Sequence, residues 1–256
     1  MFLLYGICVL QPWNAVVTCF DFFAEELPSH NVFNVFPFSV YAFQIFSMSW
    51  FIVYGQRYSY HLLISGSLAA IGCFIIVMPF LAHTGDTSGF WSCLVALMIF
   101  GLFAGASQAA AFSLAGTMPF RISGAIMLGC SVSGLFSNIL RAITLSTIPD
   151  AHYDSAIIFF VISAVYVWTC ALAYKFILEK SAYFQYYQKR ALSLKTGEEM
   201  TIGDFFRAVK NQYSLTRGLL YALTVVFAMT FILFPGVMDA TSLNCLSGIV
   251  NESSWF

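Results

Sequence analysis

Seven apolar segments, each long enough to cross a bilayer as a helix, constrain the fold of this chain more than any other feature. They lie near residues 2–22, 33–55, 61–81, 91–117, 122–147, 155–179 and 218–238. A helix needs about 20 apolar residues to span a hydrocarbon core roughly 30 Å thick. The chain is 60% hydrophobic and 9% charged, whereas soluble domains carry about a quarter charged residues. A transmembrane barrel would instead show alternating segments of about ten residues. We therefore predict an all-α polytopic membrane protein with about seven transmembrane helices.

The basic residues predict the orientation of these helices. Apart from Arg141, every Lys and Arg lies around the ends of the second, fourth and sixth segments, whereas the loops after the first, third and fifth carry Asp, Glu and His. Lys and Arg concentrate in cytoplasmic loops. We therefore predict a multi-pass protein of the plasma membrane with a cytosolic N-terminus. The acceptor sequon at Asn251 then lies outside the cell, where a glycan can be attached.

The polar residues divide the chain into four parts. Residues 1–180 are predicted to form a six-helix transmembrane bundle, 181–216 a cytosolic loop, 217–240 the seventh helix and 241–256 an extracellular tail. The run Tyr183–Ser193 within the loop is typical of a helix. The loop is either a solvated linker or a cationic amphipathic contact with the inner leaflet, and the sequence leaves both open.

The spans offer almost no titratable groups for catalysis. All four His residues lie in predicted loops, no carboxylate lies at mid-depth, and the seven Cys residues form no CxxC pair. Metal sites and acid–base dyads require such groups, so we predict no enzyme activity, no metal and no cofactor. Ser107 follows Gly-Ala as in an intramembrane protease, but no span supplies a His to activate it.

Neutral hydrogen-bonding side chains in the spans are the candidate binding groups. Gln108 lies at mid-depth near Gly101 and Gly105, whose four-residue spacing allows another helix to approach closely. An unpaired amide costs several kcal/mol in hydrocarbon. Gln108 therefore faces either a structural partner or a ligand. Tyr41 and Gln44 are three residues apart and share one face of their helix, where they are core residues or ligand contacts.

Small residues also recur every fourth position in the segment 122–147, and a single arginine follows them. Arg141 lies near the predicted outer end of this helix. Its side chain either extends to the interface or joins an inward polar patch near an outer gate, together with Asn138 on the same face.

Pro12, Trp13 and Asn14 stand side by side in the first span. Pro12 removes a backbone hydrogen bond and predicts a kink or a loosened turn. Trp13 lies near the midplane, away from the interfacial belt where tryptophans anchor. Asn14 needs a partner. An indole beside amides from several helices suits a planar, polar, uncharged solute such as a nucleobase or nucleoside.

Several ordered motifs resemble those of the equilibrative nucleoside transporters. They are LQPWN at Leu10–Asn14, QAAAFSLAG at Gln108–Gly116, Gly129–Gly134 followed by Ser137 and Asn138, LEKSAYFQYY at Leu178–Tyr187, and Phe234 with Pro235. The resemblance implies a bundle like that of the major facilitator superfamily and facilitated diffusion of nucleosides or nucleobases by alternating access. The implied partners are that substrate and the lipid bilayer, with no nucleic acid.

The resemblance also implies which residues contact substrate. The substrate tryptophan of the family falls on Trp13, with Leu10 and Val17 beside it, and the glutamine of the fourth helix falls on Gln108. Contacts from the second helix fall near Tyr41 and Gln44. Gln11 departs from the family, which usually has an apolar residue at that position.

Members of this family have eleven helices, six plus five, so this sequence corresponds to the six-helix N-terminal half and the first helix of the C-terminal half. We therefore expect an incomplete carrier that lacks the C-terminal helices needed for a full cavity. The alternative is a non-transporting remnant or partner-dependent scaffold of the same fold. A seven-helix receptor fits less well, because that class has its N-terminus outside the cell.

Overall fold

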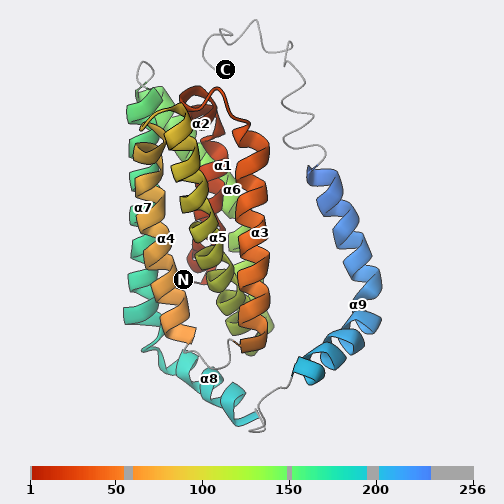
Figure 1. The fold of residues 1–256 in the computed structure, drawn as a ribbon. Helices are drawn as coiled ribbons and strands as arrows, with labels where there is room; N and C mark the ends of the chain where they lie inside the picture. Colours follow the sequence, from red (N-terminus) through yellow and green to blue (C-terminus); the bar gives the residue numbers. More distant parts are fainter. Residues whose placement is uncertain (1, 55–59, 149–151, 195–201, 232–256) are drawn as a thin grey trace, which may run out of the picture. The chain divides into compact units, whose positions relative to one another are not determined.

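The computed structural model describes residues 2–54, 60–148, 152–194 and 202–231, and this part of the chain is helical with short connections (Figure 1). Contacts divide the chain into two units, Met1–Gly197 and Glu198–Phe256. The first unit contains α1 (Phe2–Thr18), α2 (Phe20–Glu26), α3 (Val32–Tyr54), α4 (Tyr60–Ala82), α5 (Asp86–Thr117), α6 (Phe120–Thr147), α7 (His152–Ala173), the π-helical turn η2 (Tyr174–Leu178) and α8 (Ala182–Leu194). The second contains α9 (Ile202–Phe231).

The long apolar helices confirm an all-α polytopic membrane protein. Among the described residues, five spans are long and apolar enough to cross a bilayer: Val32–Phe51, Leu63–Ala82, Asp86–Thr117, Phe120–Thr147 and His152–Leu178. The pair α1 and α2 makes a sixth if the two helices count as one bent span. These six correspond to the first six predicted segments. The seventh, 218–238, falls partly on α9 and partly outside the described residues.

The first span bends between α1 and α2. The sequence predicts a kink or a loosened turn at Pro12, where α1 is continuous, and α1 and α2 meet at Cys19 with a bend of 41°. The Cys19 amide donates a hydrogen bond to the Val16 carbonyl, three residues back, which is the tightened bond typical of the last turn of a helix. The Thr18 hydroxyl also donates to the Asn14 carbonyl at 2.6 Å.

The described residues of the predicted cytosolic loop 181–216 are mostly helical. Its helix-like run is confirmed as α8, and α9 begins at Ile202, well before the expected start of the seventh helix at 217. Phe184 attaches α8 to the bundle, because its ring is fully buried and lies edge-on to Tyr174, with the centroids 6.2 Å apart. Tyr183 and Tyr186, on the same helix, are exposed.

Glycine residues set the separation of two helix pairs in the bundle. A Cβ atom on Gly105 of α5 would lie 2.5 Å from the Gln44 carbonyl oxygen of α3, and one on Gly129 of α6 would lie 2.8 Å from the Ile7 amide nitrogen of α1. The small-residue spacing predicted from the sequence is thus confirmed as close packing. Lipid tails are as apolar as Leu side chains, so burying apolar surface does not drive helices together within a membrane. Close packing of this kind supplies the driving force instead.

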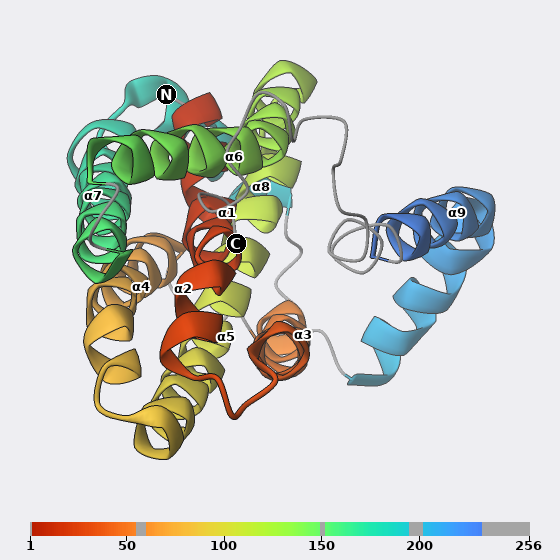
Figure 2. The ribbon, with the colours of Figure 1, turned by 90° about the horizontal axis from the view of Figure 1, so that it is seen from above.

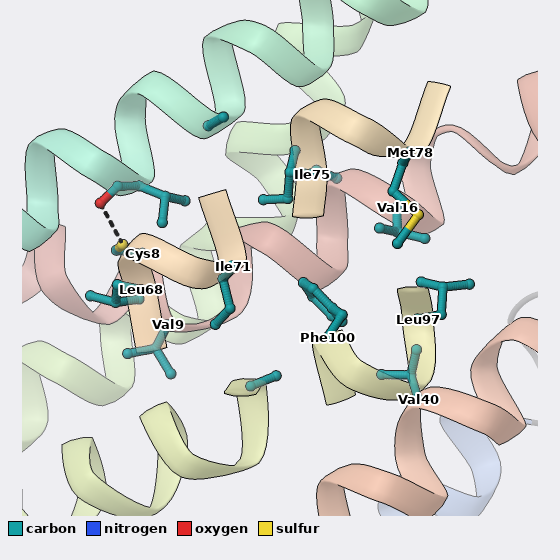
Figure 3. Packing of buried hydrophobic residues seen from close by; sticks show 14 of the residues in the cluster. Cys8, Val9, Val16, Val40, Leu68, Ile71, Ile75, Met78, Leu97 and Phe100 are labelled. Carbon is teal, nitrogen blue, oxygen red and sulfur yellow. Dashed lines mark hydrogen bonds between the residues drawn. The ribbon is translucent and has the colours of Figure 1, made fainter. Parts of the chain in front are cut away.

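Apolar side chains from several helices fill the interior of the first unit. Val9 of α1, Ile71 of α4 and Phe100 of α5 converge there, and the Cys8 thiol lies 3.9 Å from the Val167 carbonyl oxygen of α7 (Figure 3). Seen from above, α4 and α7 lie side by side, and α3 lies on the opposite side of the unit, where it packs on α5 (Figure 2). This arrangement places α1 next to α6 and α7.

Candidate functional site

Trp13 of α1 and Tyr41 of α3 contact each other inside the bundle. The indole Nε1–H donates a hydrogen bond to the Tyr41 hydroxyl oxygen at 2.8 Å. The two rings are edge-on, with centroids 5.2 Å apart and an interplanar angle of 66°, which is a favoured geometry for aromatic pairs. Trp13 is only partly buried. The indole is therefore held by α3 while part of its surface stays accessible.

Gln44 of α3 and Gln108 of α5 form a second pair. The Gln44 Nε2 group donates a hydrogen bond to Gln108 Oε1 at 2.8 Å. The close approach at Gly105 brings the two helices into range, and the Ser47 hydroxyl adds a bond to the Leu102 carbonyl at 2.6 Å. Gln108 is buried and Gln44 is partly buried. Gln108 thus has the structural partner that its depth requires, and its contact with a ligand stays a prediction.

These two pairs adjoin, because Tyr41 and Gln44 are neighbours on one face of α3. We call Trp13, Tyr41, Gln44 and Gln108 the central polar cluster. It brings together four residues that the sequence places on three different helices. The other two predicted contacts, Leu10 and Val17, are partly buried on the same face of α1 as Trp13, since they lie three residues before it and four residues after it.

A second set of polar contacts joins α1 to α6. The Asn14 Nδ2 group donates a hydrogen bond to the Ser133 hydroxyl at 2.6 Å, which supplies the partner that this amide needs. The Ser137 hydroxyl donates to Gln11 Oε1 at 2.9 Å. Gln11 is fully buried, and its Nε2 atom has no hydrogen-bond partner among the described residues. Gln11, which departs from the family pattern, is therefore a buried amide whose oxygen accepts a hydrogen bond and whose nitrogen has no partner among the described residues.

Arg141 points inward, so the interpretation that it extends to the membrane interface is wrong. The residue is 3% exposed. Its Nη2 group lies 2.9 Å from Asp21 Oδ2 of α2, its Nη1 group donates to the Ser155 hydroxyl of α7 at 3.3 Å, and its guanidinium lies 5.9 Å from the centre of the Phe159 ring. A buried arginine is stabilised by such pairing. Arg141 thus joins α6 to α2 and α7.

Asn138 stays a predicted member of this patch. Its side chain is exposed, whereas Ser137 and Arg141 lie on the buried face of α6. The packed face of α6 follows the four-residue spacing through Ser133, Ser137 and Arg141, and Asn138 lies at its edge, three residues before Arg141. The predicted glycosylation site, Asn251, lies outside the described residues.

Sequence reasoning does not identify the side chains that accept hydrogen bonds from Arg141 and Asn14. Asp21 and Ser155 bind Arg141, and Ser133 binds Asn14. The four-residue spacing of Ser133 and Ser137 was a usable signal, since it places both hydroxyls on the face that meets α1. No comparable pattern marks Asp21, because it lies 120 residues from its partner.

The central polar cluster provides an aromatic surface and neutral hydrogen-bonding groups. An indole face can stack on a flat ring, and primary amides can both donate and accept hydrogen bonds. Such groups recognise polar atoms on an uncharged planar solute. Among the residues that the structure describes, no three or more His, Cys, Asp or Glu side chains lie close enough to hold a metal ion.

Comparison with known proteins gives one family. The family model described as nucleoside transporter matches residues 94–247. The chain is 25% identical to equilibrative nucleotide transporter 1 of Arabidopsis thaliana, over 90% of this chain and 55% of that protein. It is 22% identical to equilibrative nucleotide transporter 8 of the same plant, over 91% of this chain and 59% of that protein. It is also 25% identical to equilibrative nucleoside transporter 3 of Rattus norvegicus, over 74% of this chain and 44% of that protein. The chain spans about half the length of the curated relatives it matches.

Proposed function

This chain belongs to the nucleoside transporter family, and on that premise we propose that it binds a nucleoside or nucleobase at the central polar cluster as part of a membrane carrier. The observation that carries the proposal is the row of contacts from Trp13 through Tyr41 and Gln44 to Gln108. It holds a partly accessible indole beside two amides. The indole would stack on the base, and Gln108 would bond to its polar edge.

We propose that transport is facilitated diffusion by alternating access. In this mechanism a midplane site lies between two halves of the carrier, which rock about the substrate. This chain would supply one wall, with Leu10 and Val17 beside Trp13. The central polar cluster consists of neutral side chains, which favours a carrier without proton coupling, since coupled carriers use ionisable residues within the membrane. The predicted location is the plasma membrane, with the N-terminus in the cytosol.

Direct binding tests the site. The protein in lipid nanodiscs is titrated with radiolabelled adenosine and, separately, with radiolabelled hypoxanthine. Trp13→Ala is compared with Trp91→Ala, which removes an exposed tryptophan of α5. We expect Trp13→Ala to weaken binding about 5- to 150-fold, since removing a stacked aromatic costs on the order of 1–3 kcal/mol. Trp91→Ala should bind like the unmodified protein. Unchanged affinity of Trp13→Ala would remove Trp13 from the site.

Uptake then separates a carrier from a scaffold of the same fold. The protein expressed from its full reading frame in cells that lack their own carrier should take up the labelled substrate. Trp13→Ala should reduce uptake while its amount at the cell surface stays constant. Binding without uptake would identify the non-transporting, partner-dependent scaffold instead.

A further inference from the structure

The face of α1 that carries the predicted substrate contacts continues past the bend. Leu10, Trp13 and Val17 are partly buried on this face, and Phe20, the first residue of α2, follows three residues after Val17. The Phe20 ring is edge-on to Trp13, with centroids 6.4 Å apart, and edge-on to Phe33 of α3 at 5.6 Å. Phe20 therefore adjoins the indole at the end of the bundle where α1 gives way to α2.

The residue after Phe20 is fixed by two other helices. Asp21 forms the ion pair with Arg141, and its side chain is 48% exposed while that of Arg141 is 4% exposed. Arg141 is itself positioned by the Ser155 hydroxyl and by the Phe159 ring, both on α7. A buried guanidinium thus ties the first turn of α2 to α6 and α7.

The ion pair is not the only attachment of α2. Phe22 and Phe23 are buried in the core, and the Phe23 ring contacts Phe36 of α3 at 5.6 Å and Phe160 of α7 at 6.1 Å. These contacts keep α2 on the bundle when the ion pair is removed. Asp21 lies in the first turn of α2, directly after the helix break at Cys19, so its ion pair acts on the turn that carries Phe20.

We propose that Phe20 is a further substrate contact, which closes the site at the α2 end of Trp13, and that the Asp21–Arg141 ion pair is its positioning device. The inference rests on the function proposed above. A flat base stacked on Trp13 would meet the Phe20 ring at its edge, a geometry that aromatic rings favour. The charge pattern of the loops predicts that this end is extracellular, so Phe20 would form the outer wall of the site.

The test uses binding of radiolabelled adenosine to the protein in lipid nanodiscs. Phe20→Ala should raise Kd about three- to tenfold, the range expected for the loss of one aromatic contact. Phe20→Leu, which keeps bulk without the ring, should give a smaller rise. Asp21→Asn should raise Kd to a similar extent as Phe20→Ala, and Asp21→Glu should largely restore affinity. The control is Glu25→Gln, which neutralises an exposed carboxylate on the same helix and should leave Kd unchanged.

A double variant distinguishes positioning from a general structural role. If Asp21 acts through Phe20, Phe20→Ala combined with Asp21→Asn binds no more weakly than Phe20→Ala alone, because coupled residues are not additive. If the increase in Kd of the double variant equals the product of the increases of the two single variants, the positioning role is overturned. Hydrogen exchange without substrate should rise in α2 for Asp21→Asn and not for Glu25→Gln, and equal exchange in both would also overturn it.

The same titrations separate this inference from the function on which it rests. Absence of binding by the unmodified protein would overturn both. Normal binding by the unmodified protein, weakened by Trp13→Ala but unchanged by Phe20→Ala, would overturn this inference alone.

Discussion

Gly105 of α5 offers the sharpest test of how helix packing builds the central polar cluster. In Gly105→Ala, the added Cβ would lie 2.5 Å from the Gln44 carbonyl oxygen and 2.9 Å from the Ser47 Cβ. The first distance is roughly 1 Å shorter than carbon and oxygen atoms normally pack. The obstructing atom belongs to the backbone, so no side-chain rotation removes the clash. The whole of α3 must move away from α5.

This movement has a cost in stability and a cost in binding. Overpacking of this kind destabilises a protein by about 1–3 kcal/mol, which for a chain of this size lowers Tm by roughly 2–12 °C. It also lengthens the Gln44–Gln108 hydrogen bond, now 2.8 Å, beyond about 3.5 Å, where such a bond is lost. We therefore expect Gly105→Ala both to melt earlier and to bind nucleoside more weakly.

Gly116→Ala is the matched control. Gly116 lies on the same helix, and a Cβ atom there would meet nothing within 4 Å. Gly116 is the next-to-last residue of α5, where alanine keeps part of its advantage over glycine as a helix former, so this variant should melt at about the same temperature as the unmodified protein. Thermal unfolding in lipid nanodiscs, followed by intrinsic fluorescence, measures both. If Gly105→Ala melts no lower than Gly116→Ala, the close approach of α3 and α5 is wrong.

Two further predictions concern the contact between α1 and α6. Gly129→Ala should lower Tm, because its Cβ would lie 2.8 Å from a backbone nitrogen of α1, whereas Gly124→Ala on the same helix meets nothing within 4 Å and should not. Equal melting of the two would contradict the packing of these helices. Ser137→Ala should destabilise by about 1–3 kcal/mol, since it removes the bond to the buried Gln11. Adding Gln11→Leu should recover most of that loss in the same assay, and a further loss would show that Gln11 has another partner.

The membrane spans could be predicted from the sequence because bilayer thickness imposes a minimum length on each apolar run. The first six spans follow that length closely. The bend at Cys19 could not be predicted, because no proline or glycine marks it and the packing of α2 on α3 and α7 joins segments distant in the sequence. Proline is a stronger general breaker, yet Pro12 stays within α1.

The residues of the central polar cluster could be proposed from the sequence, but the hydrogen bonds between them could not. Helical spacing places Tyr41 and Gln44 on one face, and depth marks Gln108 as a polar group that needs a partner and Trp13 as a tryptophan away from the interfacial belt. Which of them bond to one another depends on which helices meet, and nothing local encodes that. Arg141 shows the same limit. Its depth permits either direction, and the deciding residue, Asp21, belongs to a distant segment.

The pairing within the central polar cluster also bears on how a carrier can release its substrate. Within the cluster, the two amides bond to each other and the indole bonds to Tyr41, which lowers the cost of placing these polar groups within the membrane. A nucleoside that binds there must replace the Gln44–Gln108 and Trp13–Tyr41 bonds with its own. Such an exchange yields only a modest net free energy, because one hydrogen bond is lost for each one gained. Under the proposed function, this balance favours moderate affinity, so that substrate taken up on one side of the membrane can leave on the other.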